Sequence, residues 1–290
     1  MIKKTLSIIN STPKCVVRPT KHTTLDERIN RFLLNFWTKR AQNSKNFKPW
    51  YDQNVSNFLN EPQGSNIVKQ QIMLNGYSIV ENFLDDDDYQ KFLGECSKFP
   101  EKLSKAKKYG DGVSASYYNL SDEQLLGFKT KIKAVFEEVW GFKHKGEVRG
   151  SIQFLTKLKD KVDENDPNTK LHIDRYLPAV KMFYFPYEVD TKSSPFGFIP
   201  KSHILDENYL SNVSKNFYTV LKNKGTAFAL DSFSKSEELP IIVKGNTLLV
   251  AATHGMHRRI PFKSPINQEN KRISVRFLFY DEICKSRLLF

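Results

Sequence analysis

The sequence lacks a long apolar run, which argues against a membrane-spanning protein. No stretch approaches the roughly 18 apolar residues that a membrane-spanning helix needs. The apolar run Leu6–Ile9 is too short, and the residues after it too polar, for a secretory signal peptide. Together with a mean hydropathy of −0.51, these features predict a soluble protein in the cytoplasm.

Cysteine is also scarce. The three cysteines, Cys15, Cys96 and Cys284, are far apart and show no zinc-type or Cys-x-x-Cys spacing. This excludes a disulfide-rich scaffold and predicts reduced, structural thiols.

Blocks of arginine and recognised nucleic-acid motifs are absent as well. The 45 Lys and Arg residues outnumber the 32 Asp and Glu residues, giving a net charge of +13, but the lysines are scattered. Such a field attracts anions. The scattered pattern disfavours nucleic-acid binding, although the charge leaves that class open.

What the chain does contain predicts an arm followed by one domain. Residues 1–63 form a basic N-terminal arm, in which Pro13 and Pro19 disfavour regular structure. Residues Leu25–Trp37 follow helical spacing, which suits either a helix packed on the domain or one lying on a membrane. Residues 64–290 form the single domain.

Helices are expected early in this domain and strands later. Caps and apolar spacing predict three helices: Asn66–Asn75, Asp85–Phe99 and Ser121–Gly141. Alternation predicts a first strand at Tyr77–Leu84. Beyond Gly150, aromatic and β-branched runs predict mainly antiparallel strands: Ser151–Lys157, Val180–Tyr187, Thr226–Leu230, Ile241–Val243, Thr247–Ala252 and Ile273–Tyr280.

The segment Leu171–Tyr176 carries the strongest chemical signal. Residues two apart on a strand point the same way, so His172 and Asp174 would present an imidazole and a carboxylate side by side. A second histidine from the distant segment Thr253–Arg258 would complete two histidines and one carboxylate. That set leaves metal positions open and is typical of non-haem Fe(II) oxygenases.

Three further segments resemble motifs of one known family, and they occur in the same order along the chain as in that family. Tyr77–Leu84 resembles the opening "G-Y-x-x-I-x-(N/D)-F-L" motif of the phytanoyl-CoA dioxygenase-like family. Pro195–His203 resembles its "G-P-(apolar)-x-x-P-G-S-H" turn, and Gly245–Ala251 resembles its "G-D-hydrophobic" strand. With the His-x-Asp motif, the chain thus resembles this family of Fe(II)/2-oxoglutarate-dependent oxygenases over about residues 66 to 282.

The resemblance implies a double-stranded β-helix (jelly roll, cupin-like) flanked by helices from the N-terminal half. It implies Fe(II) and the co-substrates 2-oxoglutarate and O₂, with succinate and CO₂ as products. Because iron halogenases of this superfamily have a small residue at the carboxylate position, Asp174 favours hydroxylation.

The resemblance also implies the site residues. His172, Asp174 and His257 would bind iron, with His257 preferred over His254 because a basic residue and a proline-containing loop follow it, as in the family. Arg272 and Ser274 reproduce an Arg-x-Ser pattern fifteen positions after that histidine and would bind 2-oxoglutarate, with Arg276 as the second choice.

Strand residues beside the metal motif are candidates for contacts with co-substrate or substrate. They are Lys181, Tyr184, Gln153 and Lys157, with outward-facing positions as the alternative. Lys181 is preferred because comparable enzymes often have a cation there.

Two positions depart from the family pattern. Lys201 replaces the usual glycine before Ser-His and Asn246 replaces the usual aspartate, so both concern loop geometry. His203 is expected to make hydrogen bonds within its turn, and His144 is expected at the surface.

The predicted function is hydroxylation of a small metabolite, and the basic charge favours an anionic or conjugated one. The same chemistry on a protein, RNA or glycan is a second possibility, motivated by the arm and the charge. A non-catalytic jelly-roll binding protein is a third. Substrate identity and oligomeric state are not encoded in any motif.

Overall fold

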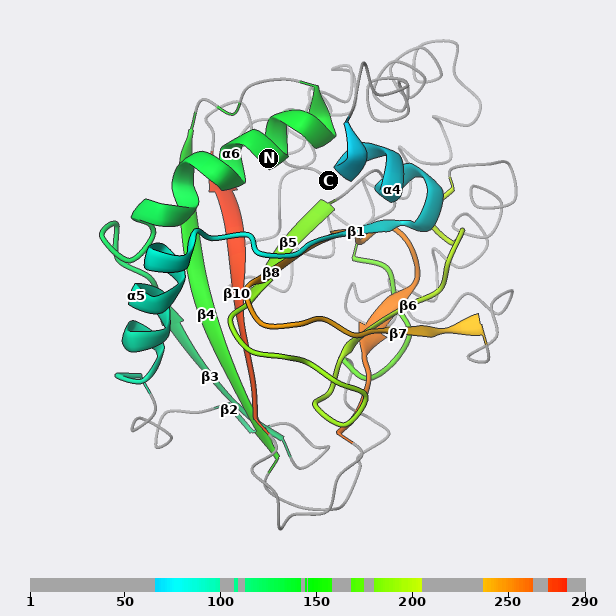
Figure 1. Ribbon diagram of the computed structural model, residues 1–290. Helices are drawn as coiled ribbons and strands as arrows, with labels where there is room; N and C mark the ends of the chain where they lie inside the picture. Colours follow the sequence, from blue (N-terminus) through cyan, green and yellow to red (C-terminus); the bar gives the residue numbers. More distant parts are fainter. Residues whose placement is uncertain are drawn as a thin grey trace, which may run out of the picture.

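The computed structural model describes residues 66–99, 107–108, 113–141, 144, 146–157, 168–174, 180–204, 237–262 and 271–280. The predicted arm and the strand predicted at Thr226–Leu230 lie outside these residues, so the division into arm and domain stays a prediction. No helix in the described stretches is long and apolar enough to cross a membrane. Two β-sheets and helices α4, α5 and α6 form the architecture (Figure 1).

Helix α4 (Ile67–Asn75) ends at the predicted Gly76 and begins after Asn66, which caps it. The Asn66 side chain accepts a hydrogen bond from the backbone N of Lys69, and Gly76 ends the helix with φ of 85°. A Cβ atom at Gly76 would lie 2.3 Å from the Phe198 ring, so only glycine allows this close approach. The end of α4 is therefore packed directly on the smaller sheet.

Helix α6 (Leu126–Trp140) begins later than predicted. The Ser121 hydroxyl accepts a hydrogen bond from Gln124 N at 3.3 Å, and Ser121 N donates to Gln124 Oε1 at 3.0 Å. This reciprocal cap closes a turn that precedes the helix rather than the helix itself. Gly141 ends α6 as predicted, and helix α5 spans Asp86–Cys96.

The described strands form one large and one small antiparallel sheet. In order, the seven-stranded sheet contains β1 (Tyr77–Val80), β8 (Thr247–Ala252), β5 (Val180–Phe185), β10 (Lys271–Tyr280), β4 (Glu147–Lys157), β3 (Val113–Asn119) and β2 (Lys107–Lys108). The three-stranded sheet contains β7 (Leu239–Ile241), β6 (Phe196–Phe198) and β9 (His257–Arg259). Segment 171–174 joins β9 through an isolated bridge between His172 and His257.

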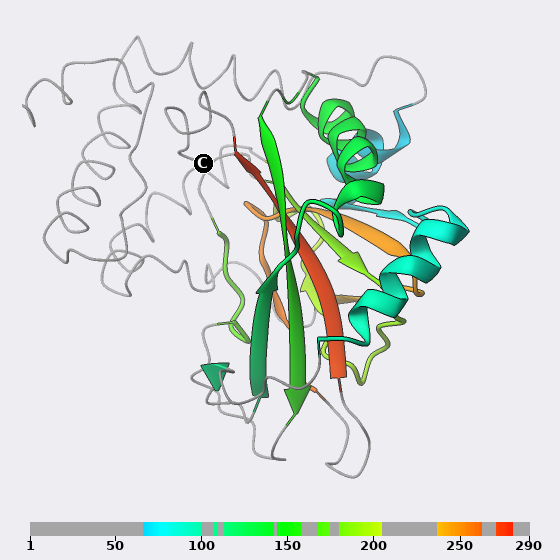
Figure 2. The same cartoon turned by 90° about the vertical axis from the view of Figure 1, so that its left-hand side faces the viewer.

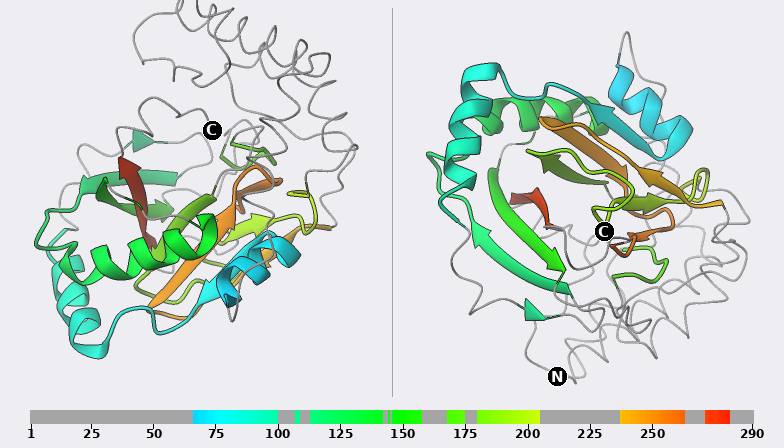
Figure 3. Two further views of the ribbon diagram at one scale, coloured as in Figure 1. Left: turned by 90° about the horizontal axis from the view of Figure 1, so that it is seen from above. Right: turned by 60° about the horizontal axis from the view of Figure 1, so that its bottom comes forward.

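The chain passes between these sheets in the order of a double-stranded β-helix. It runs from β4 in the large sheet to segment 171–174 beside the small one, and back to β5. It continues through β6 and β7, returns to β8, crosses to β9 and ends at β10. The predicted jelly roll with flanking helices is therefore confirmed. Figure 3 shows the strands around a common interior with the helices outside.

Several strand predictions need correction. Strands β2, β3, β6 and β9 were not predicted, although the histidine of β9 was selected, and β1 ends at Val80 instead of Leu84. Strand β7 ends at Ile241, while Val243 forms only an isolated bridge with Val189. Strands β2, β6, β7 and β9 carry only two or three residues, too few to show alternation.

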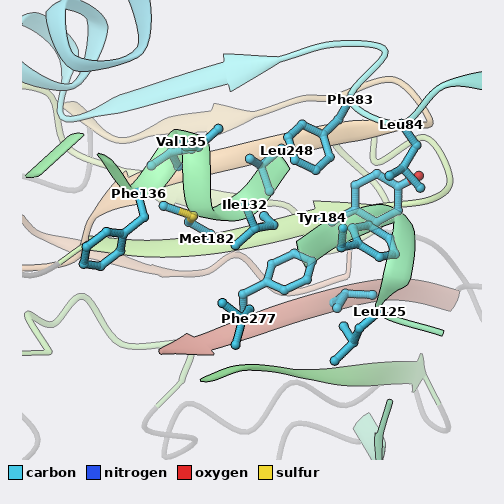
Figure 4. Close-up of a cluster of buried hydrophobic side chains, with 14 of the residues drawn as sticks. Phe83, Leu84, Leu125, Ile132, Val135, Phe136, Met182, Tyr184, Leu248 and Phe277 are labelled. Atoms are coloured by element: carbon cyan, nitrogen blue, oxygen red, sulfur yellow. The ribbon is translucent and has the colours of Figure 1, made fainter. Parts of the chain in front are cut away.

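One apolar core lies between the helices and the large sheet (Figure 2). Phe128 of α6 is at its centre, with its ring centroid 4.9 Å from that of Tyr184 and 5.0 Å from that of Phe92. All three are buried, and burying an aromatic side chain contributes about 1.5–3 kcal/mol. Figure 4 shows Met182 and Phe277 from the strands in the same cluster. These packed side chains hold the helices against the outer face of the large sheet.

Cys96 and His144 belong to this interior region. Cys96 is buried, and burial raises the pKa of its thiol to about 12, which agrees with an unreactive structural thiol. Cys15 and Cys284 lie outside the described residues. His144 is buried against the ring of Phe136, so the prediction that it lies at the surface was wrong.

The inner face of the large sheet has apolar and polar parts. A second core between the two sheets contains Phe196, Phe198 and Leu249, with Phe183 packed against it. Beyond it, β10, β4 and β3 carry polar side chains, and a small apolar cluster of Val113, Ala115, Leu155 and Phe262 follows. Because a sandwich interior is normally apolar, a polar inner face indicates a binding site.

Candidate metal centre and its cavity

Backbone hydrogen bonds bring the two predicted metal segments together. His172 and His257 each donate their backbone N–H to the other's carbonyl oxygen at 2.9 Å, and Asp174 N donates to Thr253 O at 2.8 Å. As a result, one ligand atom from each of His172, Asp174 and His257 lies within 4.8 Å of the other two. The structure thus brings together the three side chains that the sequence predicts as metal ligands.

Both imidazoles are held in the tautomer that a metal ligand needs. Nδ1 of His172 lies 2.7 Å from Lys170 O, and Nδ1 of His257 lies 2.9 Å from Gly255 O. A carbonyl oxygen only accepts, so each Nδ1 carries a proton, which leaves Nε2 as the nitrogen that can bind a metal ion. Burial, and then the neighbouring His257, lower the pKa of His172 to about 4, so it is neutral at pH 7.

Asp174 supplies the negative charge of this group. Burial alone would raise the pKa of its carboxyl group, but Lys181 and His257 outweigh burial and hold that pKa well below its usual value. Lys181 Nζ lies 2.7 Å from Asp174 Oδ2, although off the direction of a hydrogen bond, and Oδ2 accepts none from the described residues. The carboxylate oxygen is therefore available to a metal ion.

His254, the alternative distal histidine, has a different environment. It is fully buried, and its Nε2 donates a hydrogen bond to the backbone oxygen of His203 at 3.0 Å. His203 in turn donates from Nε2 to Met73 O of α4, so it bonds outside its own turn, contrary to prediction. Both histidines thus join the turn after β6 to its neighbours.

The two departures from the family pattern both lie at positions with left-handed backbone, which suits asparagine but not lysine. Lys201 has φ of 64° and Asn246 has φ of 57°, both in the left-handed region that favours glycine or asparagine. The Asn246 side chain accepts hydrogen bonds from Leu84 N and Tyr184 OH and donates to Leu84 O. Asn246 therefore attaches the start of β8 to the segment after β1.

The three candidate ligands face a cavity of about 180 Å³ between the sheets. This is more than ten times the volume of about 10–15 Å³ that one water molecule needs, so the cavity has room beyond a metal ion. Its other lining residues are Tyr117, Ser151, Gln153, Asn168, Lys181, Phe183, Phe196, Arg258, Arg259, Arg272, Ser274 and Arg276. Apart from Asp174, no carboxylate lines it within the described residues.

Arg272 and Arg276 lie in different parts of this cavity. Arg272 donates from Nη1 to the backbone oxygen of Ser194, while its Nε is buried and has no acceptor among the described residues. Burial, and then the adjacent Arg259, lower the pKa of Arg272 to about 9, which still leaves it charged at pH 7. Arg276 is exposed. Arg272 is thus the deeper cation, and Ser274 lies buried between the two on the same face of β10.

Several lining residues were not predicted as site residues, among them Arg258, Arg259 and Phe196. Arg258 makes a bidentate ion pair with Glu238, with N–O distances of 2.7 and 2.6 Å. Arg259 donates to the hydroxyl of Ser194 at 3.3 Å. The ring of Phe196 stacks on His257 at 5.2 Å, which restricts the orientation of this imidazole. The sequence signal was the basic pair directly after His257, interpreted only as a family pattern.

The strand candidates divide between the two faces of the large sheet. Lys181 and Gln153 line the cavity, so their contacts with co-substrate or substrate stay a prediction. Tyr184 points the other way into the helix-facing core, and its hydroxyl donates to Asn246 Oδ1 at 3.0 Å. Tyr184 therefore does not face the cavity. The side chain of Lys157 lies outside the part that the structure describes.

A larger hollow of about 380 Å³ lies between α5 and the start of α6. Its charged lining residues include Asp88, Lys91 and Glu95. Glu95 already accepts hydrogen bonds from Lys98 and Gln124, and this hollow gathers no metal-ligating group among the described residues. The smaller cavity between the sheets is therefore the better candidate site.

Lys181→Met is expected to destabilise the metal-free protein by removing the cation beside Asp174. We expect a loss of about 1–3 kcal/mol in the free energy of unfolding, less than for a fully buried pair, because the Lys181 side chain is 35% exposed. Added Ni²⁺ should raise the melting temperature more in this variant than in wild type, since a metal ion also balances the carboxylate.

Lys244→Met provides a matched control for this experiment. Lys244 pairs with Glu81 at 3.3 Å, but the two side chains are 79% and 50% exposed, so we expect a change below about 0.5 kcal/mol. Equal losses in the two variants, measured by urea unfolding, would contradict a special role for the Lys181–Asp174 pair.

Comparisons with known proteins give similarity of fold only. No protein-family model matches the chain, and no curated protein matches it. The epimerase SnoN in complex with Fe³⁺, alpha ketoglutarate and nogalamycin RO is similar at 16% identity and a TM-score of 0.47, over 73% of this chain and 82% of that one. Membership of the phytanoyl-CoA dioxygenase-like family stays a prediction.

Two other solved structures are similar at the same level. HygX from Streptomyces hygroscopicus with nickel and 2-oxoglutarate bound has 14% identity and a TM-score of 0.47, over 74% of this chain and 86% of that one. A Pseudomonas putida prolyl-4-hydroxylase has 10% identity and a TM-score of 0.44, over 75% of this chain and 98% of that one.

Proposed function

We propose that this protein is an Fe(II)- and 2-oxoglutarate-dependent oxygenase, with His172, Asp174 and His257 as the iron ligands. The observation that carries the proposal is the convergence of their ligand atoms within 4.8 Å, with both Nδ1 protons held by backbone oxygens. Two neutral imidazoles and one carboxylate on one side of a metal ion suit Fe(II) and leave positions for other ligands. The donor set and its tautomers thus fit the metal.

Arg272 is proposed to bind the remote carboxylate of 2-oxoglutarate, with Ser274 beside it. A buried arginine with an unused Nε donor suits a carboxylate, because the planar guanidinium can make two parallel hydrogen bonds to it. Ser274 is buried on the same strand face and offers a hydroxyl group. Lys181 contributes by balancing the charge of Asp174.

The reaction that we propose is hydroxylation of a small, polar substrate. When bound, iron and 2-oxoglutarate would activate O₂, with succinate and CO₂ as products. Phe183 and Phe196 form an apolar wall of the cavity that limits water near His257. The hydrogen bonds from Nδ1 of His172 and Nδ1 of His257 to backbone oxygens keep the two imidazole rings oriented. The retained Asp174 carboxylate favours hydroxylation over halogenation.

An anaerobic titration with Fe(II) and 2-oxoglutarate tests the proposal. Wild-type protein is expected to develop a weak visible charge-transfer band that requires both additions and is lost in Asp174→Ala combined with His257→Ala. Admission of O₂ with a panel of metabolites should then release succinate. Absence of the band from correctly folded wild-type protein would refute the proposal.

The same titration separates the two alternative functions. A band without succinate release from any metabolite, peptide or RNA tested would support a non-catalytic jelly-roll binding protein. Release only with a macromolecule would support the same chemistry on a larger substrate. The predicted arm, which motivates that second possibility, lies outside the described residues.

A further inference from the structure

A polar wall of the cavity is not used by the metal ligands or by Arg272. In the register of the sheet, Ser274 of β10 lies opposite Gln153 of β4, which lies opposite Tyr117 of β3. Arg276 lies opposite Ser151 in the next position on the same face. All five residues line the cavity. Three adjacent strands therefore present hydroxyl, amide and guanidinium groups where a jelly roll usually has an apolar interior.

Two of these polar side chains, Gln153 and Tyr117, are joined by a hydrogen bond beside Arg276. Gln153 Nε2 donates to the Tyr117 hydroxyl at 2.6 Å, which orients both side chains. Arg276 is exposed and makes no ion pair with the described residues. Its guanidinium is therefore available at the open side of the cavity, whereas Arg272 lies deeper, against Ser194.

The charges in the cavity favour an anionic ligand. Lys181 is balanced by Asp174 and Arg258 by Glu238, while Arg272 and Arg276 have no carboxylate partner in the described part of the chain. The two positive charges of Fe(II) and the two negative charges of 2-oxoglutarate cancel, so loading the site leaves the net charge of the cavity unchanged. Because Arg272 is assigned to 2-oxoglutarate, Arg276 is the cation that remains for a further anionic ligand.

We propose that Arg276, with Gln153 and Tyr117 beside it, binds a phosphate monoester group on the substrate. A phosphate monoester carries about −1.5 to −2 charges near pH 7 and three acceptor oxygens, which suit the guanidinium charge of Arg276 and the hydrogen-bond donors of this wall. Arginine binds phosphate through two parallel hydrogen bonds. This inference rests on the proposed function for the role of the bound molecule as substrate, but the anion site itself does not require that function.

Inorganic phosphate is the probe for a calorimetric test on protein loaded with Ni²⁺ and 2-oxoglutarate. Wild type is expected to bind phosphate, and Arg276→Gln is expected to bind it about 10- to 100-fold more weakly, as for loss of a charged hydrogen bond. The affinity for 2-oxoglutarate should change less than about twofold, since Arg272 is intact. Because Arg276 is exposed, the variant should fold normally.

Arg149→Gln is the matched control, because Arg149 is another exposed arginine but pairs with Glu147 at 2.9 Å away from the cavity. Equal phosphate affinity in the two variants, or no phosphate binding by wild type, would overturn the inference. A tenfold loss of 2-oxoglutarate affinity in Arg276→Gln would also overturn it and assign Arg276 to the co-substrate. Phosphate binding that depends on Arg276 in a protein that does not bind 2-oxoglutarate would support the anion site and refute the proposed function.

Discussion

Replacing His257 with alanine is expected to weaken divalent-metal binding by at least about 100-fold, since even the outer partners of metal ligands are worth about 10- to 100-fold. His257 supplies one of three converging ligand atoms, and its Nε2 lies 3.5 Å from Asp174 Oδ2. The remaining histidine and carboxylate would hold the ion at only two points. Calorimetric titration of metal-free protein with Ni²⁺, and anaerobically with Fe(II), measures this loss.

Replacing His254 with alanine should instead lower the stability of the fold and leave metal binding almost unchanged. His254 is fully buried and donates to His203 O, so His254→Ala should lower stability by about 2–4 kcal/mol while metal affinity stays within about threefold. His254→Gln keeps a side-chain N–H donor and serves if the alanine variant does not fold. Metal affinity that falls in the His254 variants and not in His257→Ala would reverse the assignment of the distal ligand.

Much of the metal centre could be predicted because its chemistry is local in the sequence. The spacing of His172 and Asp174 by two residues is enough to place both groups on one side of an extended segment. The third residue required the resemblance to a family, since nothing in the segment Thr253–Arg258 alone distinguishes its two histidines. In the structure, a backbone bridge places His257 directly beside His172, and the choice of His257 as the distal ligand stays a prediction.

The partners of these residues could not be predicted, because they come from distant parts of the chain. Ser194, which binds both Arg259 and Arg272, is 65 and 78 positions away from them, and its own φ is 61°. Which of Arg272 and Arg276 lies deeper depends on how β10 pairs with β4 and β5. Strand register determines this depth, and alternation within one strand does not reveal it.

The fold shows the same division between local and distant information. Gly76 predicted the end of α4, and the cap that Asn66 forms is equally local. The alternation of β5 correctly indicated a strand with Lys181 and Tyr184 on opposite faces, but not which face lies against the helices and which lines the cavity. The burial of His144 likewise depends on contact with Phe136 of α6. Packing between elements decides these cases.

Replacing Arg272 with leucine is expected to abolish stabilisation by 2-oxoglutarate without destabilising the free protein. The buried Nε of Arg272 has no acceptor among the described residues, and Arg259 adds like-charge repulsion. A desolvated cation of this kind is costly without an anion, so an apolar side chain of similar size should leave the free energy of unfolding unchanged or raise it by about 1–2 kcal/mol.

The ligand effect separates this role from a structural one. In the presence of Ni²⁺, 2-oxoglutarate at 100 times its dissociation constant should stabilise wild type by about 2.7 kcal/mol. Arg272→Leu should lose this increment while its affinity for Ni²⁺ is unchanged, because the three metal ligands are intact. Arg276→Gln is the control and should retain the full increment. Stabilisation of Arg272→Leu equal to that of wild type would show that another group binds the remote carboxylate. An ordinary structural arginine would instead show a loss of stability that 2-oxoglutarate does not influence.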